Sequence, residues 1–153
     1  MFKLDKKEMM IQALGKFVDM TSKELPDDVM AKLTELRAKE EKPLAKAIYD
    51  VMFENMDKAK KLSRPTCQDT GVIQYFVRTG AKFPYLGQLR DILREATILS
   101  TKSAPLRLNA VEVFDEVNTG TNIGTDVPYI TWDIVDDSTN VEIEVYQAGG
   151  GCS

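Results

Sequence analysis

Five consecutive residues, Cys67-Gln68-Asp69-Thr70-Gly71, carry the side chains best suited to chemistry in this chain. A thiolate is a soft metal ligand, a carboxylate can move a proton, and an amide or hydroxyl can orient a bound molecule. Arg64-Pro65 stiffens the approach, because proline fixes its own φ and pushes the preceding residue to extended geometry. The β-branched and aromatic run 72–77 predicts a buried strand. We therefore expect the five residues on a loop between a helix and a strand, where functional residues concentrate.

Each candidate also has an ordinary structural interpretation. An isolated cysteine such as Cys67 is usually a small buried hydrophobe, and Asp69 can be an Asx-turn residue that supports Thr70-Gly71. Arg107 can be a surface charge or a bidentate clamp for a carboxylate. The glycines 149–151 can form a turn or a nest of backbone N–H groups that binds an anion. A redox-sensing thiol at Cys67 is a further interpretation.

Composition limits the possible functions. The chain has 153 residues, of which 43% are hydrophobic and 29% charged, as in an ordinary globular domain with one core. A net charge of −4 is too small to indicate a nucleic-acid or membrane partner. Histidine is absent, so a Ser-His-Asp or Cys-His site cannot be complete within this chain. No apolar run approaches the ~20 residues of a membrane span, and we expect a cytoplasmic protein.

Residues 1–62 are predicted to be helical. A first amphipathic helix is expected to end near Thr21-Ser22, a second to begin at Pro26, and a third to begin at Pro43. The apolar positions of the second and third helices predict buried faces made of Val29, Leu33, Leu36, Leu44, Ile48, Val51 or Met52, and Met56.

Residues 63–153 are predicted to mix helix and strand. Leu86, Leu89, Ile92, Leu93 and Ala96 have the spacing of a fourth helix. Residues 130–134 and 141–145 alternate apolar and polar side chains, and 136–140 has turn composition, which predicts an antiparallel hairpin. Helices come first and strands mostly later, so the fold class is α+β in a single domain. Because a chain rarely stops on Gly149-Gly150-Gly151, we expect this one to be cut short within a loop.

Taken together, the motifs resemble the iron–sulfur hydro-lyases, which comprise the class I fumarases and the tartrate dehydratases. The matching segments run over nearly the whole chain and are Arg64-Pro65-x-Cys67-Gln68-Asp69-Thr70-Gly71, Leu106-Arg107-x-Asn109-Ala110-Val111, Asn118-Thr119-Gly120 and Gly149-Gly150-Gly151. The segment 127–135 and the Gly-Gly-Gly-Cys ending look more like the α subunit of a tartrate dehydratase than like a single-chain fumarase.

The resemblance implies a specific chemistry. Such enzymes hold a [4Fe–4S] cluster by three cysteines and leave one iron open to act as a Lewis acid on a 2-hydroxy acid. It implies that Cys67 is a cluster ligand, and that Gln68 and Asp69 contact substrate, with Asp69 in the acid/base network. It also implies that Arg107 pairs with a substrate carboxylate and that the backbone of 149–151 binds the other end of the dicarboxylate.

The chain also departs from the family pattern. The other two cluster cysteines and a histidine of the family are missing, and Cys152 stands where fumarases typically carry a serine, so it is not counted as a ligand. The resemblance therefore implies partners, namely a β subunit or C-terminal domain and an oligomeric assembly, without which this chain is expected to be inactive. A fumarate/malate enzyme and a non-enzymatic α+β interaction module are the alternatives.

Overall fold

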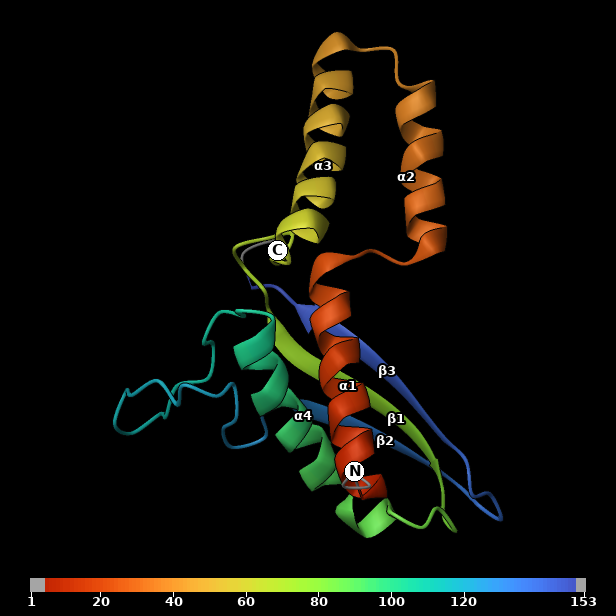
Figure 1. Cartoon of the computed structure of the whole chain (residues 1–153), viewed down its shortest axis with the longest axis vertical. Helices are drawn as coiled ribbons and strands as arrows, with labels where there is room; N and C mark the ends of the chain where they lie inside the picture. The colour runs from red at the N-terminus through yellow and green to blue at the C-terminus, as the bar shows by residue number, and fades with distance from the viewer. Residues whose placement is uncertain (1–4, 151–153) are drawn as a thin grey trace.

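The computed structural model describes residues 5–150 (Figure 1). Within that range the chain forms α1 (Lys6–Lys23), α2 (Asp27–Lys39), α3 (Pro43–Leu62), β1 (Val72–Gly80), the short 3₁₀ helix η1 (Leu86–Gln88), α4 (Leu89–Ser103), β2 (Tyr129–Val135) and β3 (Val141–Ala148). Helices precede a small mixed sheet, which confirms the predicted α+β class. Pro43 is the first residue of α3, as predicted, whereas Pro26 is the N-cap of α2 and lies one residue before its first turn.

The predicted hairpin between β2 and β3 is wrong. The strand order is β2-β1-β3, so the two strands lie on opposite sides of β1, which runs parallel to β2 and antiparallel to β3. The connecting turn closes around the end of β1, where the N–H of Gly80 donates to the carbonyl of Asn140 at 2.8 Å. A Cβ at Gly80 would lie 2.0 Å from the carbonyl oxygen of Ser138, so this crossing requires glycine. The central strand β1 is also the most buried of the three.

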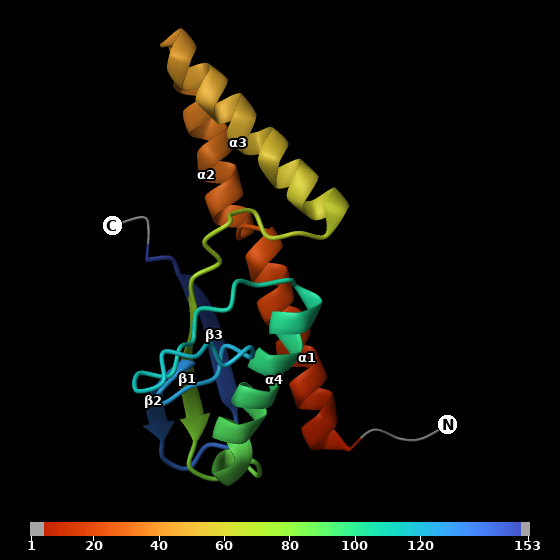
Figure 2. The same ribbon diagram turned by 90° about the vertical axis from the view of Figure 1, so that its left-hand side faces the viewer.

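The core lies between one face of the sheet and the helices α1 and α4, which lie side by side on that face (Figure 2). Ile73, Tyr75 and Val77 of β1 are buried against Val18 of α1 and Leu93 of α4. Because β1 is the central strand and points every second side chain at these helices, its backbone and this face are both removed from water. The predicted fourth helix and the predicted buried strand are confirmed.

The helices α2 and α3 form a hairpin that projects away from the rest of the molecule (Figure 1). The side chains predicted to be buried there are exposed or only partly buried: Val29, Leu33, Leu36, Leu44, Ile48, Val51, Met52 and Met56. Leu44 is 77% exposed and Val51 is 65% exposed. The apolar periodicity correctly predicted the positions of α2 and α3. Within residues 5–150, however, no other element covers the apolar faces of these two helices. None of the helices in the described range is long and apolar enough to cross a membrane.

A matched pair of substitutions tests where the core lies. We expect Ile92→Ala, at a side chain with no exposed surface, to lower the free energy of unfolding by about 2–5 kcal/mol through lost burial and a cavity. The same change at Ile48, which is 54% exposed, is expected to shift it by no more than about 0.5 kcal/mol. Urea unfolding of both variants measures the two values, and equal losses would show that α3 is packed against something this core does not contain.

A second test uses the buried hydroxyl of Tyr75. Burial raises the pKa of Tyr75 to about 12, and the hydrogen bond with Thr97 opposes this rise in part. An unfolded tyrosine has a pKa of about 10, so the stability linked to this group is complete below pH 10 and is lost as pH rises toward 12. Between pH 9 and pH 11 we expect the wild type to lose about 1 kcal/mol more stability than Tyr75→Phe. Identical pH dependence in the two proteins would contradict the burial of an intact phenol.

Candidate functional site

The segment 67–71 forms a turn that packs on the end of β3. The side chain of Asp69 accepts the N–H of Gly71 through Oδ1 at 3.0 Å, so the Asx-turn interpretation is confirmed. Gly71 has φ +71°, and a Cβ there would lie 2.5 Å from the carbonyl carbon of Ala148. The turn therefore needs glycine for its conformation and for its close approach to β3. An Asx turn holds the Asp69 carboxylate in one orientation, which is compatible with a functional role.

The glycines after β3 lie beside this turn. A Cβ at Gly149 would lie 3.1 Å from Oδ2 of Asp69, so the backbone of Gly149 lies next to the carboxylate. Gly150 faces open space. Gly151 and Cys152 lie outside the described residues. The structure thus brings Gly149 and Asp69 together, although they are far apart in the sequence.

Arg107 lies against the same turn. Its backbone N–H donates to Oγ1 of Thr70 at 2.9 Å, and its Nε donates to the carbonyl of Gln68 at 3.2 Å, across 39 residues of sequence. Nδ2 of Asn109 donates to the carbonyl of Gly71 at 2.8 Å. These contacts join the segment 106–109 to the turn 67–71.

The two joined segments border an open hollow of about 690 Å³, lined by Gln68, Asp69, Leu106, Arg107, Leu108 and Asn109. Three of the residues proposed from the sequence, Gln68, Asp69 and Arg107, therefore face one space. An amide, a carboxylate and a guanidinium around a hollow of this kind can orient a small polar anion and hold a proton acceptor near it.

Cys67 is exposed, unlike a typical structural cysteine. It lines a hollow of about 290 Å³ together with Gln68, Arg107 and Asn55, which adjoins the larger one through the shared residues. The thiol is therefore accessible at the border of the site.

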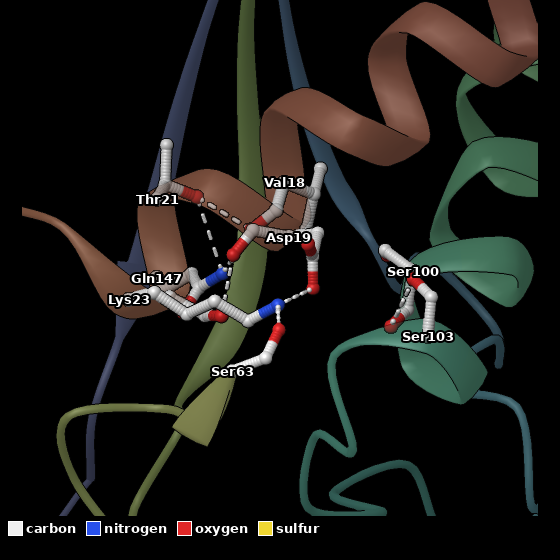
Figure 3. Close-up of polar contacts among 9 residues, drawn as sticks. Val18, Asp19, Thr21, Lys23, Ser63, Ser100, Ser103 and Gln147 are labelled. Carbon is white, nitrogen blue, oxygen red and sulfur yellow. Dashed lines mark hydrogen bonds and ion pairs between the residues drawn. The ribbon is translucent and has the colours of Figure 1, made fainter. Parts of the chain in front are cut away.

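The chain that leads to Cys67 is fastened to the end of α1 (Figure 3). Nζ of Lys23 lies 2.6 Å from a carboxylate oxygen of Asp19 and donates to Oγ of Ser63 at 2.9 Å. The N–H of Thr66 donates to the carbonyl of Ser22 at 3.0 Å. The ion pair with Asp19 lies within α1 and keeps the buried ammonium of Lys23 in place, while the hydrogen bond from Lys23 to Ser63 joins the loop to the helix.

Sequence reasoning missed the residues that build this support. From the sequence alone, Lys23 is interpreted as an ordinary basic residue in the last turn of a helix, and Thr70 and Asn109 are interpreted as loop residues. No local sequence pattern indicates their hydrogen-bond partners, because each of these residues bonds to a segment at least 37 residues away in the sequence. The spacing Arg107-x-Asn109 was a usable signal only as part of a family motif.

The resemblance implies a metal cluster at this site, which needs a set of ligands. Within residues 5–150, no group of three or more cysteine, aspartate or glutamate side chains is placed to hold a metal ion. Cys67 has the exposure and the firmly held loop that suit one ligand of an iron–sulfur cluster, which needs several thiolates. The described residues thus offer one ligand position and not a whole ligand set.

In this α+β domain the Cys-Gln-Asp-Thr-Gly turn lies directly against Arg107, and both segments border the hollow. The family model described as fumarate hydratase (Fumerase) matches residues 11–153, and the chain belongs to this family.

Several curated relatives are named as tartrate dehydratase α subunits. The chain is 53% identical over 142 residues to the L(+)-tartrate dehydratase subunit alpha of Escherichia coli K12, and the match covers 93% of this chain and 47% of that protein. The proteins of the same name from Escherichia coli O157:H7 and Shigella sonnei are 54% and 53% identical over the same shares of length. The chain therefore spans about half the length of the curated relatives it matches.

The turn can be tested by a pair of glycine substitutions. Gly71→Ala is expected to lower the free energy of unfolding by about 1–3 kcal/mol, because alanine is strained at positive φ and its Cβ would collide with β3. Gly87→Ala is the control, since a Cβ there meets no atom within 4 Å, and it should change stability by no more than about 1 kcal/mol. Thermal unfolding of the two variants provides the comparison, and a Gly71→Ala protein as stable as the control would contradict the close packing of turn and strand.

Proposed function

We propose that this chain forms part of the substrate site of an iron–sulfur L(+)-tartrate dehydratase α subunit, whose reaction removes water from L-tartrate to give oxaloacetate. The observation that carries the proposal is the meeting of Gln68, Asp69 and Arg107 around one hollow beside the exposed Cys67. The tartrate dehydratase α subunits at 53–54% identity support the substrate.

Arg107 binds a carboxylate of the substrate. Its Nε is occupied by the carbonyl of Gln68, so the guanidinium is oriented before any ligand arrives. An arginine held in this way loses less conformational freedom on binding, and its planar fork matches a carboxylate. The side-chain amide of Gln68, a residue that lines the same hollow, orients the same anion.

Asp69 takes part in proton transfer. Its Oδ1 is held by the N–H of Gly71, and its Oδ2 lies near the backbone of Gly149. A carboxylate held by an Asx turn beside the hollow is restricted in its orientation, which suits a group that must accept a proton from carbon. The backbone of Gly149, Gly150 and Gly151 is proposed to bind the far end of the substrate.

Cys67 provides one ligand of a [4Fe–4S] cluster, and the remaining ligands come from chain outside the described residues. When bound, such a cluster supplies an open iron that polarises the substrate hydroxyl as a Lewis acid. The contribution of this chain is to hold the thiol at the border of the hollow by the contacts of Ser63 and Thr66 with α1. A reduced, cytoplasmic environment suits such a thiolate.

A β subunit and an oligomeric assembly are proposed as partners. The relatives carry the words "subunit alpha" in their names and are about twice as long as this chain. Leu44, Ile48 and Val51 on α3 form an exposed apolar stripe, which is a feature of surfaces that become buried on assembly. The complete enzyme would then supply the catalytic and cluster-binding groups that residues 5–150 lack.

Fumarate hydration is the second candidate reaction, because the family model is described as fumarate hydratase. Both reactions remove or add water beside a carboxylate and use the same three side chains here. Comparing kcat/KM of the complete enzyme for L-tartrate, fumarate and malate decides between them. A preference for fumarate and malate over L-tartrate would make this chain a fumarase.

The proposed roles can be tested in the complete α subunit assembled with its β subunit and reconstituted anaerobically with iron and sulfide. Cys67→Ser is expected to lose the cluster and the activity, measured as iron content, visible absorbance and oxaloacetate formation. Arg107→Lys should keep the iron but raise KM for L-tartrate about tenfold or more, because the bidentate carboxylate contact is lost.

Arg90→Lys, at an exposed arginine of α4 that does not line the hollow, is the matched control and should behave as the wild type. Full iron content in Cys67→Ser would remove Cys67 from the ligand set. An unchanged KM in Arg107→Lys would remove Arg107 from the substrate site.

A further inference from the structure

Asn122 is a buried asparagine behind the hollow. It lies in the connection between α4 and β2, only 6% exposed, and its φ of +57° places it in the left-handed region. Its Oδ1 accepts the N–H of Asn109 at 2.7 Å. Its Nδ2 donates to the carbonyl of Arg107 at 2.8 Å and to Oγ1 of Thr101 at 3.2 Å. The Asn122 carboxamide therefore forms hydrogen bonds through both its acceptor oxygen and its donor nitrogen.

These bonds replace the pairing that a neighbouring strand would provide. The segment 106–109 carries Arg107 but belongs to no strand, so its backbone groups need other partners. Thr70 accepts the N–H of Arg107, while Asn122 binds the carbonyl of Arg107 and the N–H of Asn109. The backbone on both sides of the Arg107 side chain is therefore held by side chains alone.

Asn122 also connects this segment to the core. Thr101, which is buried on α4, donates its own hydroxyl to the carbonyl of Thr97 at 2.8 Å and receives the amide of Asn122. Because α4 is packed on the sheet, the hydrogen bond from the Asn122 amide to Thr101 ties the loop to a rigid part of the core.

We propose that Asn122 is the positioning residue of Arg107, holding its backbone so that the guanidinium reaches the carbonyl of Gln68 and faces the hollow. The role in catalysis rests on the proposed function of Arg107. Asparagine suits this position because it tolerates positive φ better than most residues and because its amide donates and accepts. Glycine would keep the backbone conformation and remove the amide, and aspartate would keep the acceptor and remove the donor.

The first test measures Arg107 itself, in the chain of 153 residues, without substrate or cluster. The side-chain Nε–H signal of Arg107 is identified in a ¹⁵N NMR spectrum by its absence in Arg107→Lys. In Asn122→Gly and in Asn122→Asp we expect this signal to shift and its hydrogen exchange to accelerate at least severalfold, because the bond to Gln68 is no longer maintained.

Asn118→Gly is the matched control. Asn118 lies in the same connection and donates Nδ2 to the carbonyl of Leu108, one residue after Arg107. If the effect belongs to Asn122, this variant leaves the Nε–H signal of Arg107 unchanged. An unchanged signal in both Asn122 variants, or an equal change in Asn118→Gly, overturns the proposal, because the loop as a whole would then be responsible.

The second test is a double-mutant cycle in the complete enzyme with L-tartrate as substrate. Asn122→Gly alone is expected to raise KM about tenfold with a smaller change in kcat, as expected when an oriented binding group is lost. In an Arg107→Ala background it should raise KM no further, since Asn122 acts through Arg107. Additive effects would overturn the positioning role. An Arg107→Ala enzyme with normal KM would instead refute the proposed function of Arg107, while the NMR result would still decide whether Asn122 positions it.

Discussion

The burial of β1 beneath α1 and α4 is the constraint on which the rest of the structure depends. Ile73, Tyr75 and Val77 point into the core, so the register of β1 cannot slip by one residue without exposing all three. The strand begins at Val72, immediately after the turn that contains Cys67 and Asp69. Because β1 is fixed, the position of Gly71, the last residue of the turn, is fixed as well. The end of β3 packs against the same glycine and restrains it from a second side.

The site itself is built from loops, and side chains supply the hydrogen bonds that a sheet would otherwise provide. Thr70, Asn109 and Asn122 each bind backbone groups of another segment. Short polar side chains of this kind compete with regular secondary structure, which makes them effective in irregular segments. A loop fastened by many such bonds has few alternative conformations, and a site with few conformations binds its ligand with a smaller entropic cost.

The α2–α3 hairpin follows a different principle. Its helices form because their local sequence is favourable and amphipathic, yet the apolar side of α3 has no partner among residues 5–150. Toward the tip of the hairpin, Arg37 of α2 pairs with Asp50 of α3 and lies over the ring of Phe53, and at its base Lys60 of α3 pairs with Glu24. Within residues 5–150, these two helices therefore depend on local helix propensity and polar pairs more than on burial.

The sequence by itself determined the elements that local patterns encode. Apolar period and proline placement located the helices, the β-branched run located β1, and the motif around Cys67 identified the turn and the family. These are properties of residues close together in the chain, which propensity and period describe directly.

Only the tertiary structure decided which elements meet. Alternation could not reveal that β2 and β3 flank β1 instead of pairing with each other, because an amphipathic strand looks the same in either arrangement. Nor could the apolar stripe of α3 show that no other element among residues 5–150 would cover it. The contacts of Lys23 with Ser63 and of Asn122 with Arg107 join residues that the fold alone brings together. Their hydrogen bonds depend on distances in space, and those distances exist only once the core has formed.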